Sequence, residues 1–178
     1  MDKYMTSGVK EQINKFIVQQ KNIPFTMKNI YQMIDFIVQT YPNQIDKSIE
    51  EVFDKMTTHY HDNRFNVEGW KTNSHYILNE KFIFPSIVNG DYGTFRVNYG
   101  SRSLVLVNDL LRVLCYLNGK DYDKCEKMYD AVKKDYQSNT WYNWEFFDIK
   151  FFKKGTMHFK FKNKDVWAVF NQNVARLK

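Results

Sequence analysis

The sequence predicts an α+β fold, and three observations point to it. Residues 9–61 and 103–137 carry apolar side chains at helical spacing, whereas residues 144–162 alternate apolar and charged side chains as strands do. Hydrophobic residues make up 43% of the chain, which is enough for a packed core. We therefore expect a helical N-terminal part, a small antiparallel sheet that includes a 144–152/156–162 hairpin, and a C-terminal helix.

The length of 178 residues fits one α+β domain over residues 1–178, within which residues 1–42 are a candidate for a helical arm. The first third of the chain predicts three helices, at residues 9–20, 27–41 and 46–61. Thr26 is a suitable N-cap for the second, and Pro42 is expected to close it. The third starts at Asp46, and its apolar face consists of Ile49, Val52, Phe53 and Met56.

The helical period disappears between residues 62 and 102. "KFIF" at 81–84 reads as a short strand stopped by Pro85, and "TFRVNY" at 94–99 as a strand in a hairpin or lobe. Irregular segments of this kind often carry function when a rigid scaffold holds them.

Helical periodicity returns in the second half of the chain. The very apolar segment 103–120 predicts a central buried helix that Gly119 stops, and 121–137 predicts an amphipathic helix that starts at Asp121. Residues 163–177 predict the last helix, with Asn163 as its cap.

The segment "FFKKGTMHFKF" at 151–161 predicts a tight hairpin whose register depends on its loop. A two-residue loop would mix apolar and charged side chains on one face. A three-residue loop at 153–155 separates them completely, because side chains alternate with period two. It also places Gly155 where such a loop needs a left-handed residue. The expected pairs are Phe147/Phe161, Ile149/Phe159 and Phe151/Met157 on the apolar face, and Phe146/Lys162, Asp148/Lys160, Lys150/His158 and Phe152/Thr156 on the other.

The polar face of this hairpin is the first candidate site. It gathers four basic or imidazole side chains with Asp148, framed by Phe146 and Phe152: Lys150, His158, Lys160 and Lys162. A lysine beside His158 disfavours the imidazolium, so the histidine is expected to be neutral at pH 7. Neutral imidazole can act as a general base or as a hydrogen-bonding group, and aromatic rings between lysines suit base stacking. An ordinary solvent-facing sheet surface is the alternative.

The segment "NRFNVEGWKTN" at 63–73 is the second candidate site. A recognition loop would use Arg64 and Lys71 on phosphates, Trp70 on a base and Asn73 on base edges. The same residues also fit a buried tryptophan anchor with asparagine-capped turns.

Charge and motifs limit the classes of function. The formal net charge of +6 favours a polyanionic partner such as nucleic acid, although a solvated basic surface gives the same count. Cys115 and Cys125 fall in segments expected to be helical, with no zinc spacing, which fits a reduced cytoplasmic setting. The chain contains no phosphate loop, dinucleotide loop or membrane-spanning run, so we expect no cofactor, no metal and no membrane.

Three stretches resemble an uncharacterised bacterial and phage family, domain of unknown function 4942. They are "HDNRFNVEGWKTNSHYILNEKFIFP" at 61–85, "NDLLRVLCYLNGK" at 108–120 and "WEFFDIKFFKKGTMHFKFKNKDVWAVFN" at 144–171. The resemblance covers roughly residues 45–171. The family-like positions are Asn63, Arg64, Trp70, Lys71, Asn73, Lys81, Gly155, His158 and Lys160. This chain has Thr156 where the family pattern has Asn.

The resemblance implies a role directed at nucleic acid, because such domains are often joined to, or encoded near, adenine-specific DNA methyltransferases. The first hypothesis is therefore a nucleic-acid-binding accessory domain in a bacterial host cell, with DNA favoured over RNA and a methyltransferase or other phage or host protein as a further partner. The second is a metal-independent nuclease with His158 as general base, and with Lys160 and Arg64 or Lys71 stabilising the phosphorane. The third is a phage protein that binds another protein.

Overall fold

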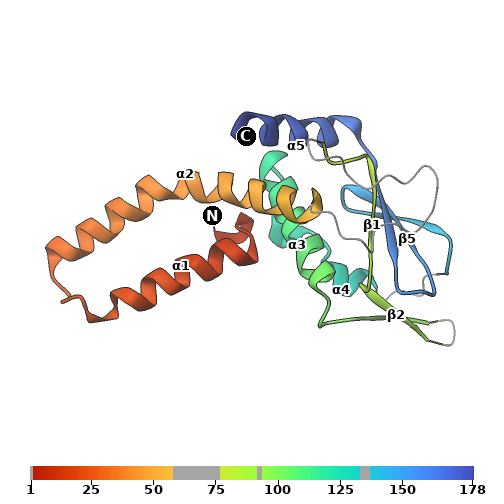
Figure 1. The fold of residues 1–178 in the computed structure, drawn as a ribbon, viewed down its shortest axis with the longest axis horizontal. Coiled ribbons are helices and arrows are strands. Elements are labelled where there is room, and N and C mark those ends of the chain that lie inside the picture. The colour runs from red at the N-terminus through yellow and green to blue at the C-terminus, as the bar shows by residue number, and fades with distance from the viewer. Residues whose placement is uncertain (1, 58–76, 92–93, 133–136) are drawn as a thin grey trace.

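The protein has an α+β fold in which helices lie on one side of an antiparallel sheet and two helices project away from it (Figure 1). The computed structural model describes residues 2–57, 77–91, 94–132 and 137–178. The helices are α1 (Ser7–Gln19), α2 (Met27–Thr57), α3 (Arg102–Leu117), α4 (Met128–Ala131) and α5 (Lys164–Leu177), with short 3-10 turns η1 (Asp2–Tyr4), η2 (Gln20–Asn22) and η4 (Tyr122–Lys124).

The main sheet has four strands in the order β1-β6-β5-β4, each antiparallel to its neighbour. These strands are β1 (Lys81–Phe84), β4 (Trp141–Trp144), β5 (Phe147–Phe151) and β6 (Met157–Phe161). A separate two-stranded ribbon pairs β2 (Val88–Asp91) with β3 (Thr94–Val97). The predicted strand at 81–84 is confirmed, and the one predicted at 94–99 is shorter, since β3 ends at Val97; it belongs to a hairpin, one of the two arrangements expected.

The core lies between the sheet and the helices. β5 and β6 bury every second side chain, so their apolar face consists of Phe147, Ile149, Phe151, Met157, Phe159 and Phe161. Aromatic rings fill this layer, and Phe82 stacks on Phe159 with ring centroids 5.2 Å apart. On the helical side α3 supplies a buried apolar face, as predicted for the central helix, and the predicted face of α2 at Ile49, Val52, Phe53 and Met56 is buried as well.

The predicted helix boundaries are confirmed at three positions. The Thr26 side chain accepts a hydrogen bond from the backbone N–H of Asn29 at 3.3 Å, and Asn163 caps α5 by accepting from Asp165. Gly119 follows α3 with a φ of +63°, the left-handed conformation that ends many helices.

The prediction that Pro42 closes a helix is wrong. α2 is continuous over 31 residues from Met27 to Thr57 and includes both the 27–41 segment and the start of the 46–61 segment. A proline inside a helix removes one backbone hydrogen bond and costs about 3 kcal/mol. Helical sequence on both sides, and burial of Ile45 and Ile49 in the core, oppose that local cost. The predicted end at residue 61 lies outside the described residues.

The prediction of one helix over 121–137 is also wrong. Asp121 caps only the short turn η4, and α4 starts later, at Met128. Both backbone groups of Glu126 bond to side chains at the end of β4 and in the turn that follows it. Its N–H donates to the Glu145 carboxylate at 2.7 Å, and its carbonyl accepts from the Trp144 indole at 3.1 Å. These groups are therefore unavailable to a helix that would run through position 126.

The predicted strand at 144–152 divides in two. β4 ends at Trp144, Glu145 and Phe146 form a two-residue turn, and β5 begins at Phe147. Glu145 has a φ of +45°, a conformation that glycine or asparagine usually supplies. The sequence carries neither residue at this turn, which is why the alternation appeared to run on as one strand.

Cys115 lies in α3 as expected, whereas Cys125 lies just after η4 and not in a helix. Both thiols are buried and unoxidised, with their sulfur atoms 3.4 Å apart. Burial raises the pKa of each thiol, so neither is a ready nucleophile.

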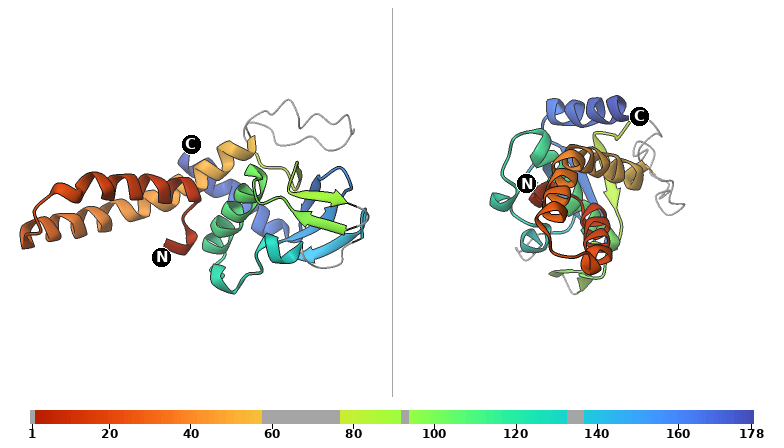
Figure 2. Two further views of the ribbon diagram at one scale, coloured as in Figure 1. Left: turned by 90° about the horizontal axis from the view of Figure 1, so that it is seen from below. Right: turned by 90° about the vertical axis from the view of Figure 1, so that its left-hand side faces the viewer.

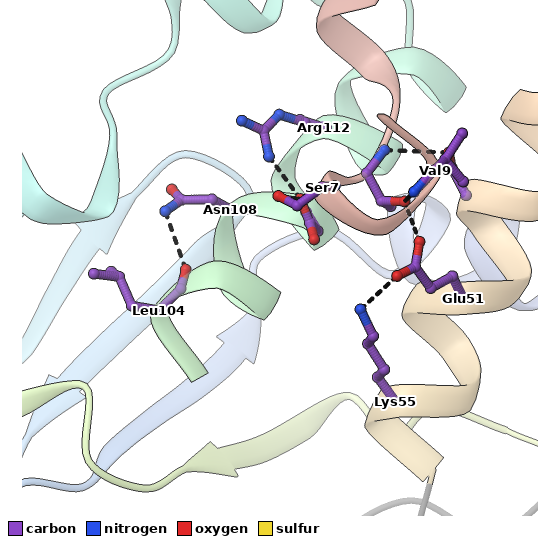
Figure 3. A network of polar contacts seen from close by, with 10 residues as sticks. Ser7, Val9, Glu51, Lys55, Leu104, Asn108 and Arg112 are labelled. Atoms are coloured by element: carbon purple, nitrogen blue, oxygen red, sulfur yellow. Dashed lines mark hydrogen bonds and ion pairs between the residues drawn. The ribbon is translucent and has the colours of Figure 1, made fainter. Parts of the chain in front are cut away.

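A polar network holds the start of α1 against α2 and α3 (Figure 3). The backbone N–H of Ser7 donates to Asp109 Oδ1 at 3.1 Å, and Arg112 donates to the same oxygen at 2.6 Å. The Thr6 hydroxyl donates to Glu51. Beyond this base, α1 and the first part of α2 run antiparallel and away from the rest of the molecule (Figure 2). We call residues 7–36 the arm.

Candidate nucleic-acid interface

The predicted three-residue hairpin loop is confirmed. Phe147 pairs with Phe161, Ile149 with Phe159 and Phe151 with Met157, while Asp148 pairs with Lys160 and Lys150 with His158. Gly155 has a φ of +82°, and its N–H donates to the Phe152 carbonyl at 2.9 Å. The register therefore places Lys150, His158 and Lys160 on one face, opposite the buried aromatic layer.

The other two strands extend this face into two rows of side chains that cross the whole sheet. The first row, from β1 to β4, is Ile83, His158, Lys150 and Trp141. The second row is Lys81, Lys160, Asp148 and Asn143. We call these two rows, with the flanking Phe152 and Lys162, the basic face. It carries four lysines against one aspartate, a net charge of +3.

Aromatic rings surround Lys150 at the centre of the first row. Its ammonium lies 5.4 Å from the ring centroid of Trp141 and 5.5 Å from that of Phe152. The Phe152 ring in turn lies 4.3 Å from the imidazole of His158. Trp141 is 41% exposed, so this row offers solvent a flat ring beside a positive charge.

His158 is half-buried, and its pKa is lowered to about 4. Burial is the larger cause, because a desolvated imidazolium is unfavourable, and the nearby Lys150 ammonium adds to the effect. The prediction of a neutral histidine is confirmed in direction. Its main cause is the packing of the imidazole, which the sequence did not indicate.

The second row carries the more accessible charges. Lys160 and Lys162 are exposed, and Lys162 donates a hydrogen bond to the Asn143 side chain at 2.9 Å. Asp148 lies opposite Lys160 across the β5–β6 pair, as predicted. Phe146 contributes its carbonyl, which accepts from the Lys162 N–H at 3.0 Å, while its ring lies 5.2 Å from the Lys120 ammonium.

The other predicted site residues are Arg64, Trp70, Lys71 and Asn73, together with the family-like Asn63. They lie outside the described residues, so whether they share a surface with the hairpin stays a prediction. Lys81 is described, and it faces Lys160 across the β1–β6 pair.

Sequence reasoning missed three members of the basic face, Ile83, Asn143 and Trp141, and Trp141 matters most because it supplies the exposed ring. Trp141 belongs to β4, a strand hidden by the glycine-free turn that follows it. The alternating "WYNW" at 141–144, with an aromatic residue at each end, was the one available signal.

Within residues 2–57, 77–91, 94–132 and 137–178, no group of three or more His, Cys, Asp or Glu side chains could hold a metal ion. Among the helices described there, none combines the length and the apolar character needed to cross a bilayer.

Comparison with known proteins identifies a family for this chain. No curated protein and no solved structure matches the chain. A family model described as domain of unknown function (DUF4942) matches residues 1–178, and so extends the resemblance seen at roughly 45–171 to the N-terminal helices. The chain therefore belongs to the DUF4942 family over its whole length.

Proposed function

We propose that this protein is an accessory domain that binds nucleic acid through the basic face of its sheet. The observation that carries the proposal is the row His158, Lys150 and Trp141, in which an exposed ring adjoins a lysine and a neutral imidazole. Proteins that hold single-stranded nucleic acid combine positive charge along the backbone with aromatic rings on which bases stack. The basic face has both components on one rigid sheet.

The side chains divide into two roles. Lys160 and Lys162, which are exposed, would neutralise phosphates, and Trp141 would stack on an unpaired base. His158 would remain neutral throughout the physiological pH range and donate or accept a hydrogen bond. We propose DNA over RNA, because the resemblance points to partners that modify DNA.

Binding is favoured over cleavage on chemical grounds. A general base works best when its pKa lies near the working pH, and an imidazole with a pKa of about 4 is a weak base at neutral pH. On this face the Phe152 ring lies 4.3 Å from the imidazole, and the nearby Lys150 ammonium further disfavours its protonated form.

A gel-shift titration tests the proposal. Labelled duplex DNA, single-stranded DNA and RNA of one sequence are titrated with protein at several salt concentrations. With about four phosphate contacts, affinity for a single strand should fall roughly 50-fold between about 50 and 200 mM salt. Running the same samples denatured separates binding from cleavage, since shortened strands would favour the nuclease hypothesis. Absence of any shift at low salt would contradict the proposal and favour a protein partner.

Variants assign the binding to this face. Lys160→Gln should reduce the slope of log affinity against log salt by about 0.7, the share of one phosphate contact. Trp141→Ala should weaken binding by about 1–3 kcal/mol and leave that slope unchanged. Lys124→Gln is the matched control, because it removes an exposed lysine from η4, which packs against α3 and η1. An equal loss in Lys124→Gln would show only a general effect of net charge.

A further inference from the structure

The arm has no core of its own. In the described stretch 10–36, no residue is buried, although apolar side chains occur throughout it. The two helices touch through Phe16 and Phe36, whose rings stack with centroids 4.7 Å apart. Toward the tip, an open hollow of about 440 Å³ remains between them, lined by Ile17, Ile23, Pro24, Phe25, Ile30 and Met33 among others.

A second apolar face lies on the outside of α2. Met27, Tyr31 and Ile34 are 64%, 64% and 51% exposed, and they are spaced four and three residues apart. That spacing places them along one side of the helix and is the repeat of a seam between packed helices. Phe25, at the tip, is 94% exposed. The surface is thus shaped to receive another helix and not an extended strand.

The exposed apolar area is as large as a stable interface requires. Nine large apolar residues of the arm are exposed: Ile17, Val18, Ile23, Phe25, Met27, Tyr31, Met33, Ile34 and Phe36. Because one fully exposed aromatic side chain contributes about 150–250 Å², the nine together present on the order of 900 Å². A standard protein–protein interface buries about 800 Å² on each partner. This area is shared between the hollow and the outer face of α2, so only the sum over both faces reaches that size.

We propose that the arms of two copies of this chain pack side by side into a four-helix bundle, so that the protein is a dimer. Two helices cannot enclose a core, whereas four helices can, and a second copy presents the same helical seam. A two-fold axis places the same patch of both copies in contact. An apolar patch can meet itself in this way without bringing like charges together. The arm extends away from the rest of the molecule, so two arms can pack together without a clash between the other parts of the two copies (Figure 2).

The charge of the arm permits this pairing. Within residues 7–36 there are four lysines and two acidic residues, a net charge of +2 per copy. Salt screens a repulsion of this size, and it does not weaken the burial of apolar surface. The dimer is therefore expected to persist, or to strengthen, as salt concentration rises. This response is opposite to the one expected for nucleic-acid binding, and the inference does not depend on the proposed function.

Analytical ultracentrifugation of the full chain tests the inference over low to several hundred micromolar concentrations. Wild-type protein should sediment at twice its 21.5 kDa chain mass. Ile34→Lys and Tyr31→Lys should each weaken the dimer at least tenfold, because each places a charge in the seam. Val105→Lys is the matched control: Val105 is 45% exposed on α3, away from the arm, and its change should leave the mass at that of a dimer.

Two results would overturn the inference. If wild-type protein stays at the mass of one chain at every concentration, the arm does not form a dimer and must bind a different partner. This measurement uses no variant, so it does not depend on a variant being folded. A dimer that survives both Ile34→Lys and Tyr31→Lys would place the interface elsewhere. Circular dichroism on each variant checks that the helices remain.

Discussion

At the scale of the residue, Gly155 allows the hairpin that builds the basic face. Its φ is +82°, and a Cβ added there would lie 2.6 Å from the Val88 carbonyl oxygen of β2. Gly119 provides a control, because its φ of +63° is similar but a Cβ would meet nothing within 4 Å. Left-handed strain alone costs an alanine about 1–2 kcal/mol.

We expect Gly119→Ala to lose about 1 kcal/mol of unfolding free energy and Gly155→Ala to lose about 3 kcal/mol, since the second substitution adds a backbone clash to the strain. Urea unfolding of both variants measures the difference. Equal losses at the two positions would mean that β2 does not lie against the hairpin loop.

His158 gives the protein a dependence of stability on pH. Its pKa is about 4 in the folded protein and about 6.5 in the unfolded chain, so the unfolded chain binds more protons between these values. Stability is therefore lost as pH falls from 6.5 toward 4. Because the imidazole is only half-buried, the loss is on the order of 1–2 kcal/mol.

The variant His158→Gln isolates this contribution from those of the carboxylates. Wild type and variant are unfolded with urea at pH 7 and at pH 5. The wild type should lose more stability than the variant between the two pH values. The same loss in both proteins would contradict the lowered pKa.

At the scale of the element, Asp109 of α3 holds the start of the arm against the rest of the protein. Its carboxylate is fully buried on α3 and accepts from the Ser7 backbone, the Ser7 hydroxyl at 3.0 Å and the Arg112 guanidinium. Burial raises its pKa, and the charge of Arg112 opposes that rise. A carboxylate at the first turn of α1 also suits the positive end of the helix.

Asp109→Ala should destabilise the protein by about 3–5 kcal/mol, because it removes these acceptors and leaves the Arg112 charge without its carboxylate. Asp109→Asn keeps one acceptor oxygen and should cost less, about 1–3 kcal/mol. Thermal unfolding followed by circular dichroism ranks the two variants. A loss of less than 1 kcal/mol in Asp109→Ala would contradict this role.

Sequence patterns predicted correctly those features that depend only on residues close together in the chain. The β5–β6 register followed from alternation and from one glycine, and the helix caps at Thr26 and Asn163 followed from their side chains. The failures came where distant contacts decide. The strand β4 ends at Trp144 because Glu145, the next residue, has a positive φ. The Glu145 carboxylate accepts from the backbone N–H of Glu126, where a helix was predicted.

The candidate site was predictable to the same extent. Alternation placed Lys150, His158 and Lys160 on one face, because a strand pair fixes which side chains share a side. Trp141 was not predictable, because its place beside Lys150 depends on the β4–β5 pairing. The burial that lowers the pKa of His158 likewise arises only from the packed sheet.

At the scale of the whole molecule, the arm and the sheet lie at opposite ends, with α3 and α5 between them (Figure 1). A dimer joined through the arms would carry two basic faces. The two proposals together therefore predict bivalent binding to long strands, for which linkage raises affinity well above that of one site.

Ile34→Lys separates the two proposals, because Ile34 lies in the arm, at the opposite end of the molecule from the sheet. The variant should bind a short oligonucleotide as wild type does, but lose at least tenfold in affinity for a long single strand. Equal affinity of variant and wild type for the long strand would contradict the bivalent arrangement.

Locating bound nucleic acid on the protein distinguishes the basic face from every other surface. A single strand that contains bromodeoxyuridine is crosslinked to the full chain by ultraviolet light, and the modified peptides are identified by mass spectrometry. If nucleic acid binds the basic face, crosslinks should form at Trp141 and on the hairpin strands around Phe152 and His158. Crosslinks confined to the arm, or to α3 and α5, would contradict it.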